Sequence, residues 1–77
     1  MKRSNFIEVQ EYILNINEII YIRKAANSLI ELIIALSHGY YIYLEYKNEE
    51  ERSIALSLIG DLLVAKKMGE VLENEEL

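Results

Sequence analysis

The sequence predicts an α+β fold: an antiparallel β-meander of three to four strands, followed by one C-terminal α-helix packed on one face. Two observations support this prediction. As far as Tyr46, short β-branched and aromatic runs alternate with small polar clusters, which is typical of strands joined by turns. After Asn48, the apolar residues recur at the spacing of a helix. The chain has 77 residues, which is enough for a single small domain over residues 1–77 and not for two.

Three of the expected strands can be placed by pattern alone. Apolar and polar residues alternate in part over about 6–14, which indicates one strand or two short ones that meet near Glu11. The cluster N15-I-N-E18 favours a tight turn, because Asn side chains bond to nearby backbone. The runs IIYIRK at 19–24 and YYIYLEY at 40–46 are β-branched and aromatic, so each predicts a strand.

The segment between these two runs, residues 28–39, fits both a helix and a strand. Ser28 and Glu31 have the spacing of a capping box, which favours a helix. A strand at 29–36, buried on both faces and followed by a glycine-containing hairpin turn, also fits. We favour the strand, because a turn directly before the next strand makes a sheet neighbour the simplest partner.

The helix is predicted at about 49–67. Asn48 is a natural N-cap, and the glutamates that follow it lie where the helix dipole favours negative charge. Its apolar stripe is expected to consist of Ile54, Ala55, Leu58, Ile59, Leu62 and Ala65. Gly69 is expected to follow the end of the helix, and the acidic tail 69–77 to fray or form a loose turn.

Apolar positions and turn residues between Phe6 and Leu63 carry a resemblance to a known family. They are F6-I-E-V9, Asn15 or Asn17 before Ile19 and Ile22, I30-E-L-I-I-A-L36, Gly39 and N48-E-E-E51. In this order they resemble short bacterial and phage proteins built as a β-meander with one C-terminal helix, such as the FlbD family of small flagellar proteins. The resemblance implies a strand at 29–36 and no catalytic residues. The chain departs from it in lacking a glycine in the first turn region and in its longer acidic tail.

Composition argues against several classes of function. The chain has no cysteine, and therefore no disulfide and no cysteine-based metal site. Its net charge of -5, with Lys2-Arg3, Arg23-Lys24 and Lys66-Lys67 as the longest basic runs, opposes binding to phosphate backbones. The longest apolar stretches are far shorter than the roughly 20 residues of a membrane span, and the first residues lack the apolar run of a secretory signal. A cytoplasmic location is expected.

No catalytic, metal or cofactor site is expected. Ser37, His38 and Asp61 supply the residue types of a catalytic triad, but neighbouring residues in a strand or turn point apart. The carboxylates of E49-E-E51 splay around a helix and do not form a closed ligand set. The three glycines are isolated, so no glycine-rich phosphate loop is present. The sequence therefore predicts a protein that is not an enzyme.

Excess apolar surface predicts self-association instead. Hydrophobic residues make up 52% of the chain, which is more than one small core easily hides. Tyr41 and Tyr43 share one face of their strand, and a single helix covers only one face of a sheet. Leu56 and Leu63 fall outside the predicted helical stripe, so the helix is expected to contact a further neighbour.

These expectations combine into one predicted function and one alternative. The predicted function is a small non-catalytic protein-interaction or assembly module, homo-oligomeric and of phage or mobile-element origin, with a protein partner. Its expected interface residues are Tyr41, Tyr43, Leu56 and Leu63. The alternative is a small nucleic-acid-binding transcriptional regulator, in which oligomerisation gathers the basic pairs into one patch.

Overall fold

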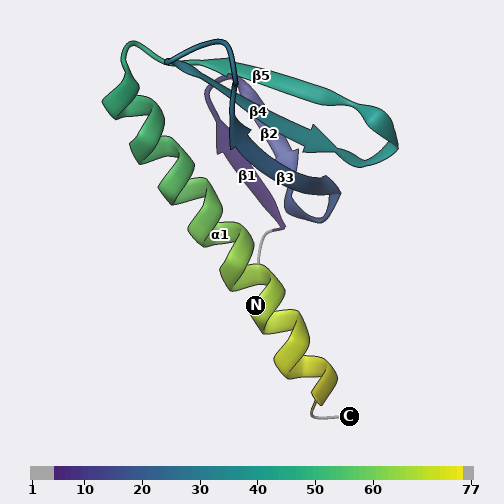
Figure 1. The fold of residues 1–77 in the computed structure, drawn as a ribbon. Helices are drawn as coiled ribbons and strands as arrows, with labels where there is room; N and C mark the ends of the chain where they lie inside the picture. The colour runs from purple at the N-terminus through teal and green to yellow at the C-terminus, as the bar shows by residue number, and fades with distance from the viewer. Residues whose placement is uncertain (1–4, 76–77) are drawn as a thin grey trace.

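The computed structural model describes the backbone of residues 5–75 and the side chains of residues 5–65. Its strands are β1 (Phe6–Val9), β2 (Tyr12–Asn15), β3 (Ile19–Lys24), β4 (Glu31–Leu36) and β5 (Tyr41–Glu45), and its helix is α1 (Glu49–Glu75). Within these residues a two-stranded sheet, β1-β2, precedes a three-stranded sheet of order β3-β4-β5, and all neighbouring strands are antiparallel (Figure 1). The predicted α+β fold is confirmed, with five strands in place of three or four.

The segment predicted at 6–14 is a hairpin of two short strands, which is the second of the two interpretations given above. Val9 pairs with Tyr12, so Gln10 and Glu11 form a two-residue turn. Gln10 has a positive φ of 52°, the backbone region that two-residue hairpin turns require at their first central position. Glycine or asparagine usually supplies that conformation, and a glutamine gives no such signal in the sequence.

The polar cluster after the hairpin forms the predicted turn. Asn15 Oδ1 accepts a hydrogen bond from Asn17 N at 2.9 Å, and residues Ile16–Glu18 make one short 3₁₀ turn. This turn leads directly into β3, whose bounds are those predicted from its β-branched run.

Residues 31–36 form the central strand β4, so the preference for a strand in this segment is confirmed. The Ser28 hydroxyl accepts a hydrogen bond from Ile30 N at 3.2 Å, which is a local turn and not a helix cap. The link from β4 to β5 is the predicted hairpin turn, Ser37–Gly39, in which Leu36 N donates to Tyr40 O at 2.7 Å. His38 and Gly39 both have positive φ, at 66° and 81°.

The core lies on one face of the three-stranded sheet. Its fully buried side chains are Leu32 and Ile34 from β4 and Leu44 from β5. They form one cluster with Val9, Leu14 and Ile19 from the N-terminal half and Ile59 from α1. The hairpin β1-β2 and the helix therefore cover the same face of the sheet, side by side.

The helix packs through a stripe that only partly matches the predicted one: Ala55 and Ile59 are confirmed, and the other members differ. Its buried and half-buried positions are Arg52, Ala55, Leu56, Ile59, Gly60 and Leu63, which recur at helical spacing. Ile54, Leu58 and Leu62, which the sequence places in the stripe, are exposed. Apolar residues cover so wide an arc of this helix that its periodicity permits either orientation, and contact with the sheet selects one.

Helix α1 also ends later than predicted: it runs from Glu49 to Glu75 and passes through Gly69. The tail expected at 69–77 is thus helical as far as Glu75. A single glycine inside a helix costs only about 1 kcal/mol relative to alanine, and the chain has no proline to end the helix. Gly69 acts as a helix terminator only when its backbone is left-handed, which the sequence alone does not determine.

Two side chains fix the start of α1. Asn48 Oδ1 accepts a hydrogen bond from Glu51 N at 2.8 Å, which is the predicted N-cap. Arg52 is buried, with 3% of its surface exposed, and its Nη1 donates to Ser28 O at 2.7 Å. This bond ties the first turn of the helix to the loop that enters β4. Glu49 Oε2 lies 4.0 Å from Arg52 Nη2, and because Glu49 is exposed, this ion pair adds little to the stability of the fold.

We expect alanine to have opposite effects at two glycines. A Cβ at Gly39 or Gly60 meets no atom within 4 Å, so the difference between them is conformational. Gly39→Ala should lower the free energy of unfolding by about 1 kcal/mol, because a φ of 81° disfavours any side chain. Gly60→Ala should raise it by about 0.5 to 1 kcal/mol, because Gly60 lies inside a helix. Urea denaturation of both variants measures the signs, and equal signs would contradict this account.

We also expect Arg52 to stabilise the docked helix. Arg52→Met keeps the length of the side chain but leaves Ser28 O without its donor, which should lower the free energy of unfolding by about 1 to 3 kcal/mol. Glu49→Gln is the matched control and should change it by less than about 0.5 kcal/mol. If both variants unfold at the same urea concentration as the parent chain, the anchoring role of Arg52 is wrong.

Candidate interaction surfaces

The face of the three-stranded sheet opposite the core is open in the described chain. Side chains alternate along the strands, so Ile33 and Ala35 of β4 point away from the core formed by Leu32 and Ile34. Ala35 lies between Tyr21 and Tyr41, and Ile33 lies between Arg23 and Tyr43. No described helix or strand covers this face, which we call the tyrosine face and define by Tyr21, Arg23, Ile33, Ala35, Tyr41 and Tyr43.

The tyrosine face combines a closed centre with exposed aromatic rings. Ile33 and Ala35 are buried although no described element packs above them, because the larger side chains of the two neighbouring strands flank them. Tyr21, Tyr41 and Tyr43 remain 40%, 53% and 57% exposed. Tyrosine is well suited to such a surface, since its ring is apolar and its hydroxyl stays hydrated. The structure thus brings Tyr41 and Tyr43 together, as predicted, and adds Tyr21.

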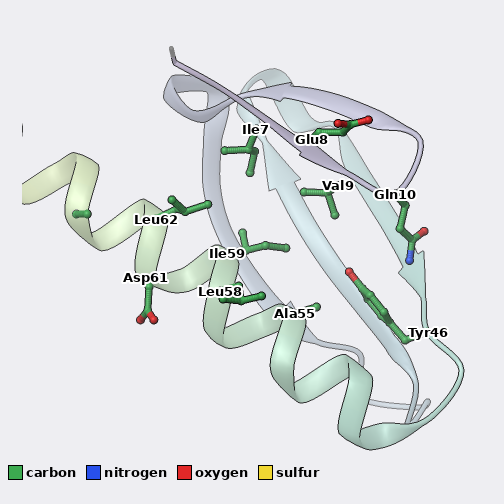
Figure 2. Close-up of a pocket in the computed structure, with 11 residues that line it drawn as sticks. Ile7, Glu8, Val9, Gln10, Tyr46, Ala55, Leu58, Ile59, Asp61 and Leu62 are labelled. Atoms are coloured by element: carbon green, nitrogen blue, oxygen red, sulfur yellow. The ribbon is translucent and has the colours of Figure 1, made fainter. Parts of the chain in front are cut away.

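A second apolar surface lies between the β1-β2 hairpin and α1. It is a groove of about 710 Å³, and Figure 2 shows side chains from the hairpin and the helix converging on it. Its lining residues are Ile7, Glu8, Val9, Gln10, Tyr46, Ala55, Leu58, Ile59, Asp61, Leu62 and Ala65. The helix contributes Leu58 and Leu62 as exposed side chains on one wall. The groove is therefore an apolar channel with a few polar groups among its lining residues.

Tyr46 and Gln10 lie at one end of this groove (Figure 2). Burial raises the pKa of the Tyr46 phenol, and Gln10 beside it acts more weakly in the opposite direction. The Gln10 side chain also donates from Nε2 to Glu45 O at 2.8 Å, which ties the tip of the hairpin to the end of β5. The lining residues include Glu8 and Asp61 and no basic residue, but in Figure 2 both carboxylates point away from the apolar side chains that converge on the groove, so the groove offers mainly apolar contact area.

Two of the predicted interface residues, Leu56 and Leu63, pack against the core and are not fully available at the surface. Leu56 and Leu63 are half-buried and pack against the core cluster. Only their exposed edges remain for another molecule. Among the helical residues whose side chains are described, the large apolar ones that are exposed are Ile54, Leu58, Leu62 and Val64. The exposure of Leu58 and Leu62 was not predicted, because the apolar periodicity of the sequence assigned both residues to the stripe that faces the sheet.

The residues with the types of a catalytic triad are divided between one turn and the helix. Ser37 and His38 are in the turn between β4 and β5, where the Ser37 hydroxyl donates to Glu18 O at 3.3 Å. Asp61 is on α1 and lines the groove (Figure 2). Among the described residues, no group of three or more His, Cys, Asp or Glu side chains is arranged to hold a metal ion. Within the same part of the chain, no helix is long and apolar enough to cross a membrane.

Comparison with known proteins gives no relative: no family model, no curated protein and no solved structure matches the chain. The resemblance to the FlbD family therefore stays a prediction.

The orientation of α1 can be tested at two neighbouring residues. Leu58→Glu should change the free energy of unfolding by less than about 0.5 kcal/mol, because Leu58 is 61% exposed. Ile59→Ala should lower it by about 2 to 5 kcal/mol, because Ile59 is buried in the core cluster. Thermal and urea denaturation compare the two variants. A loss for Leu58→Glu as large as that for Ile59→Ala would mean that Leu58 also packs on the sheet, as the predicted stripe has it.

Proposed function

We propose that the chain is a small, non-catalytic protein-interaction or assembly module that forms homo-oligomers. The observation that supports this most directly is the tyrosine face: three exposed rings surround an apolar centre on a face of the sheet that no described element covers. Tyrosine is enriched at protein interfaces, and charged residues are depleted at their centres. Arg23 and the tyrosines provide a polar rim around Ile33 and Ala35. The proposed contact residues are Tyr41 and Tyr43, with Tyr21 beside them.

The exposed wall of the groove supports the same proposal. Leu58 and Leu62 leave apolar surface on the helix although the chain is short. A chain of this length buries only about 60 to 65% of its unfolded surface when it folds alone, less than a larger domain does, so burying these side chains in an oligomer would add to its stability. Leu56 and Leu63 supply only their edges to such a contact.

The alternative function, a nucleic-acid-binding regulator, has less support. Arg23 and Lys24 are the basic pair on the described surface near the tyrosine face, and Arg23 Nη1 donates to Lys24 O at 3.2 Å. Glu31 and Glu45 lie opposite each other at the same end of the sheet and offset this charge. The pair Lys2-Arg3 lies outside the described residues, as do the side chains of Lys66-Lys67. A cytoplasmic location and a phage or mobile-element origin are further parts of the proposal.

Self-association and its dependence on the tyrosine face can be measured together. Light scattering at micromolar concentration should give a mass that is a multiple of 9.0 kDa. Tyr43→Glu should shift the chain toward the monomer, because a carboxylate in the contact must lose its hydration. Tyr12→Glu is the matched control, since Tyr12 is also exposed but lies on β2, away from the tyrosine face and from β5. A parent chain that stays at 9.0 kDa would reject the proposal.

Binding to nucleic acid separates the two functions. We expect fluorescence anisotropy to detect no binding of a labelled DNA duplex at about 50 mM salt, the condition under which phosphate contacts are strongest. Binding that weakens steeply as salt is raised would instead favour the regulator. Arg23→Gln identifies whether the basic pair on β3 is responsible for any such binding.

A further inference from the structure

We propose that a second copy of the chain adds to the outer edge of β5, antiparallel to it, with Tyr41 opposite Tyr43 of the second copy. This inference rests on the proposed self-association and names the part of the chain that forms the contact. It follows from the hydrogen-bond pattern of the sheet, from the difference between its two edges and from the position of Gln10.

The backbone hydrogen bonds determine which residues of β5 face outward. Leu36 N donates to Tyr40 O at 2.7 Å and Tyr46 N donates to Ile30 O at 2.9 Å. In an antiparallel pair, hydrogen-bonded positions alternate with positions whose N–H and C=O point away from the partner strand. Tyr40, Ile42, Leu44 and Tyr46 therefore bond to β4, whereas the backbone groups of Tyr41, Tyr43 and Glu45 point out of the sheet.

Most of these outward groups have no partner. Glu45 O accepts the Gln10 side chain at 2.8 Å. Within the described residues, the N–H and C=O groups of Tyr41 and Tyr43 have no hydrogen-bond partner. The unpaired part of the edge is therefore short, and it ends at Glu45, whose carbonyl accepts the hydrogen bond from Gln10.

The opposite edge of the same sheet is protected. Strand β3 has a register shift between Ile19 and Tyr21, and it ends in Arg23 and Lys24. Bulges and cations are the usual means by which a strand edge avoids pairing with another chain. The sequence YIYLE of β5 has neither, and no lysine, arginine or proline. Strand addition is therefore expected at β5 and not at β3.

The outward groups of β5 are complementary to themselves. When two copies of β5 lie antiparallel around a two-fold axis at Ile42, Tyr41 of each copy meets Tyr43 of the other. Each such pair exchanges two hydrogen bonds, and the axis generates two pairs, so four bonds form in all. The bond from Gln10 to Glu45 O stays intact in this register. If Tyr43 lay on the axis instead, Tyr41 would face Glu45 of the second copy, whose carbonyl is already occupied.

Side chains and charges favour the same register. Tyr41 and Tyr43 of the two copies become direct neighbours on the tyrosine face, and aromatic cross-strand pairs stabilise antiparallel strands. The two Glu45 residues lie at opposite ends of the seam, about 20 Å apart at roughly 3.4 Å per residue. That separation exceeds the Debye length of about 8 Å at physiological salt, so their repulsion is screened. A second copy is therefore the occupant that the edge fits.

Because the parent chain has no cysteine, single cysteines can map the seam by disulfide formation. Ile42→Cys should give a covalent dimer after mild oxidation, because two residues facing each other across the axis have Cα atoms about 4.5 Å apart. Tyr41→Cys and Tyr43→Cys should each stay uncrosslinked alone and should crosslink when mixed. Non-reducing electrophoresis and mass spectrometry identify the products, and circular dichroism checks that each variant is folded.

The outcomes separate this inference from the proposed function. Crosslinking of Tyr43→Cys alone, or of no variant in a chain that scatters light as an oligomer, would overturn the β5 seam and leave self-association standing. A monomeric parent chain overturns both. A dimer crosslinked through Ile42→Cys supports both.

A second pair of variants tests the backbone bonds without cysteine. Tyr43→Pro and Tyr43→Ala both remove the ring, but only proline also removes the outward N–H. Proline is tolerated at an edge position whose N–H faces outward, so both variants should fold. Sedimentation should give a dimer at least tenfold weaker for Tyr43→Pro than for Tyr43→Ala. Equal dissociation constants for the two variants would show that the Tyr43 N–H makes no bond across the contact.

Discussion

Strand β4 carries apolar side chains on both faces, and the arrangement of the other elements depends on that property. Leu32 and Ile34 need a cover on one side, which the hairpin and the helix provide together. Ile33 and Ala35 need one on the other side, which only the flanking strands provide. The described elements build one such cover. The tyrosine face is the consequence of a central strand that is apolar on both faces when the described elements cover only one of them.

The same limit explains the groove beside the helix. Helix α1 touches the sheet through one stripe, and the hairpin reaches the sheet next to it. Two elements that share one face leave a channel between them, whose walls include Leu58 and Leu62. Both apolar surfaces thus arise from one shortage of covering elements.

Much of the fold could be predicted from the sequence, because in most segments the local sequence pattern favours the same secondary structure as the long-range contacts. The β-branched run at 19–24 and the cap at Asn48 are examples. The missed features are those that local pattern does not determine. Gln10 has a left-handed backbone conformation, which the residue type glutamine does not predict. Gly69 lies inside a helix, although glycine often ends one. The orientation of the helix was also missed, because its apolar arc fits the sheet in two ways.

The candidate site shows the same division. The shared face of Tyr41 and Tyr43 follows from the two-residue period of a strand, and it was predicted. The unpaired edge of β5 could not be predicted, because it depends on strand order and on the phase of the hydrogen bonds. The register shift in β3 then has a consequence for the size of the assembly. A sheet with two open edges grows without limit into a fibre, whereas a sheet with one open edge stops after a single addition. The irregularity at Ile20 is therefore what makes the proposed assembly finite.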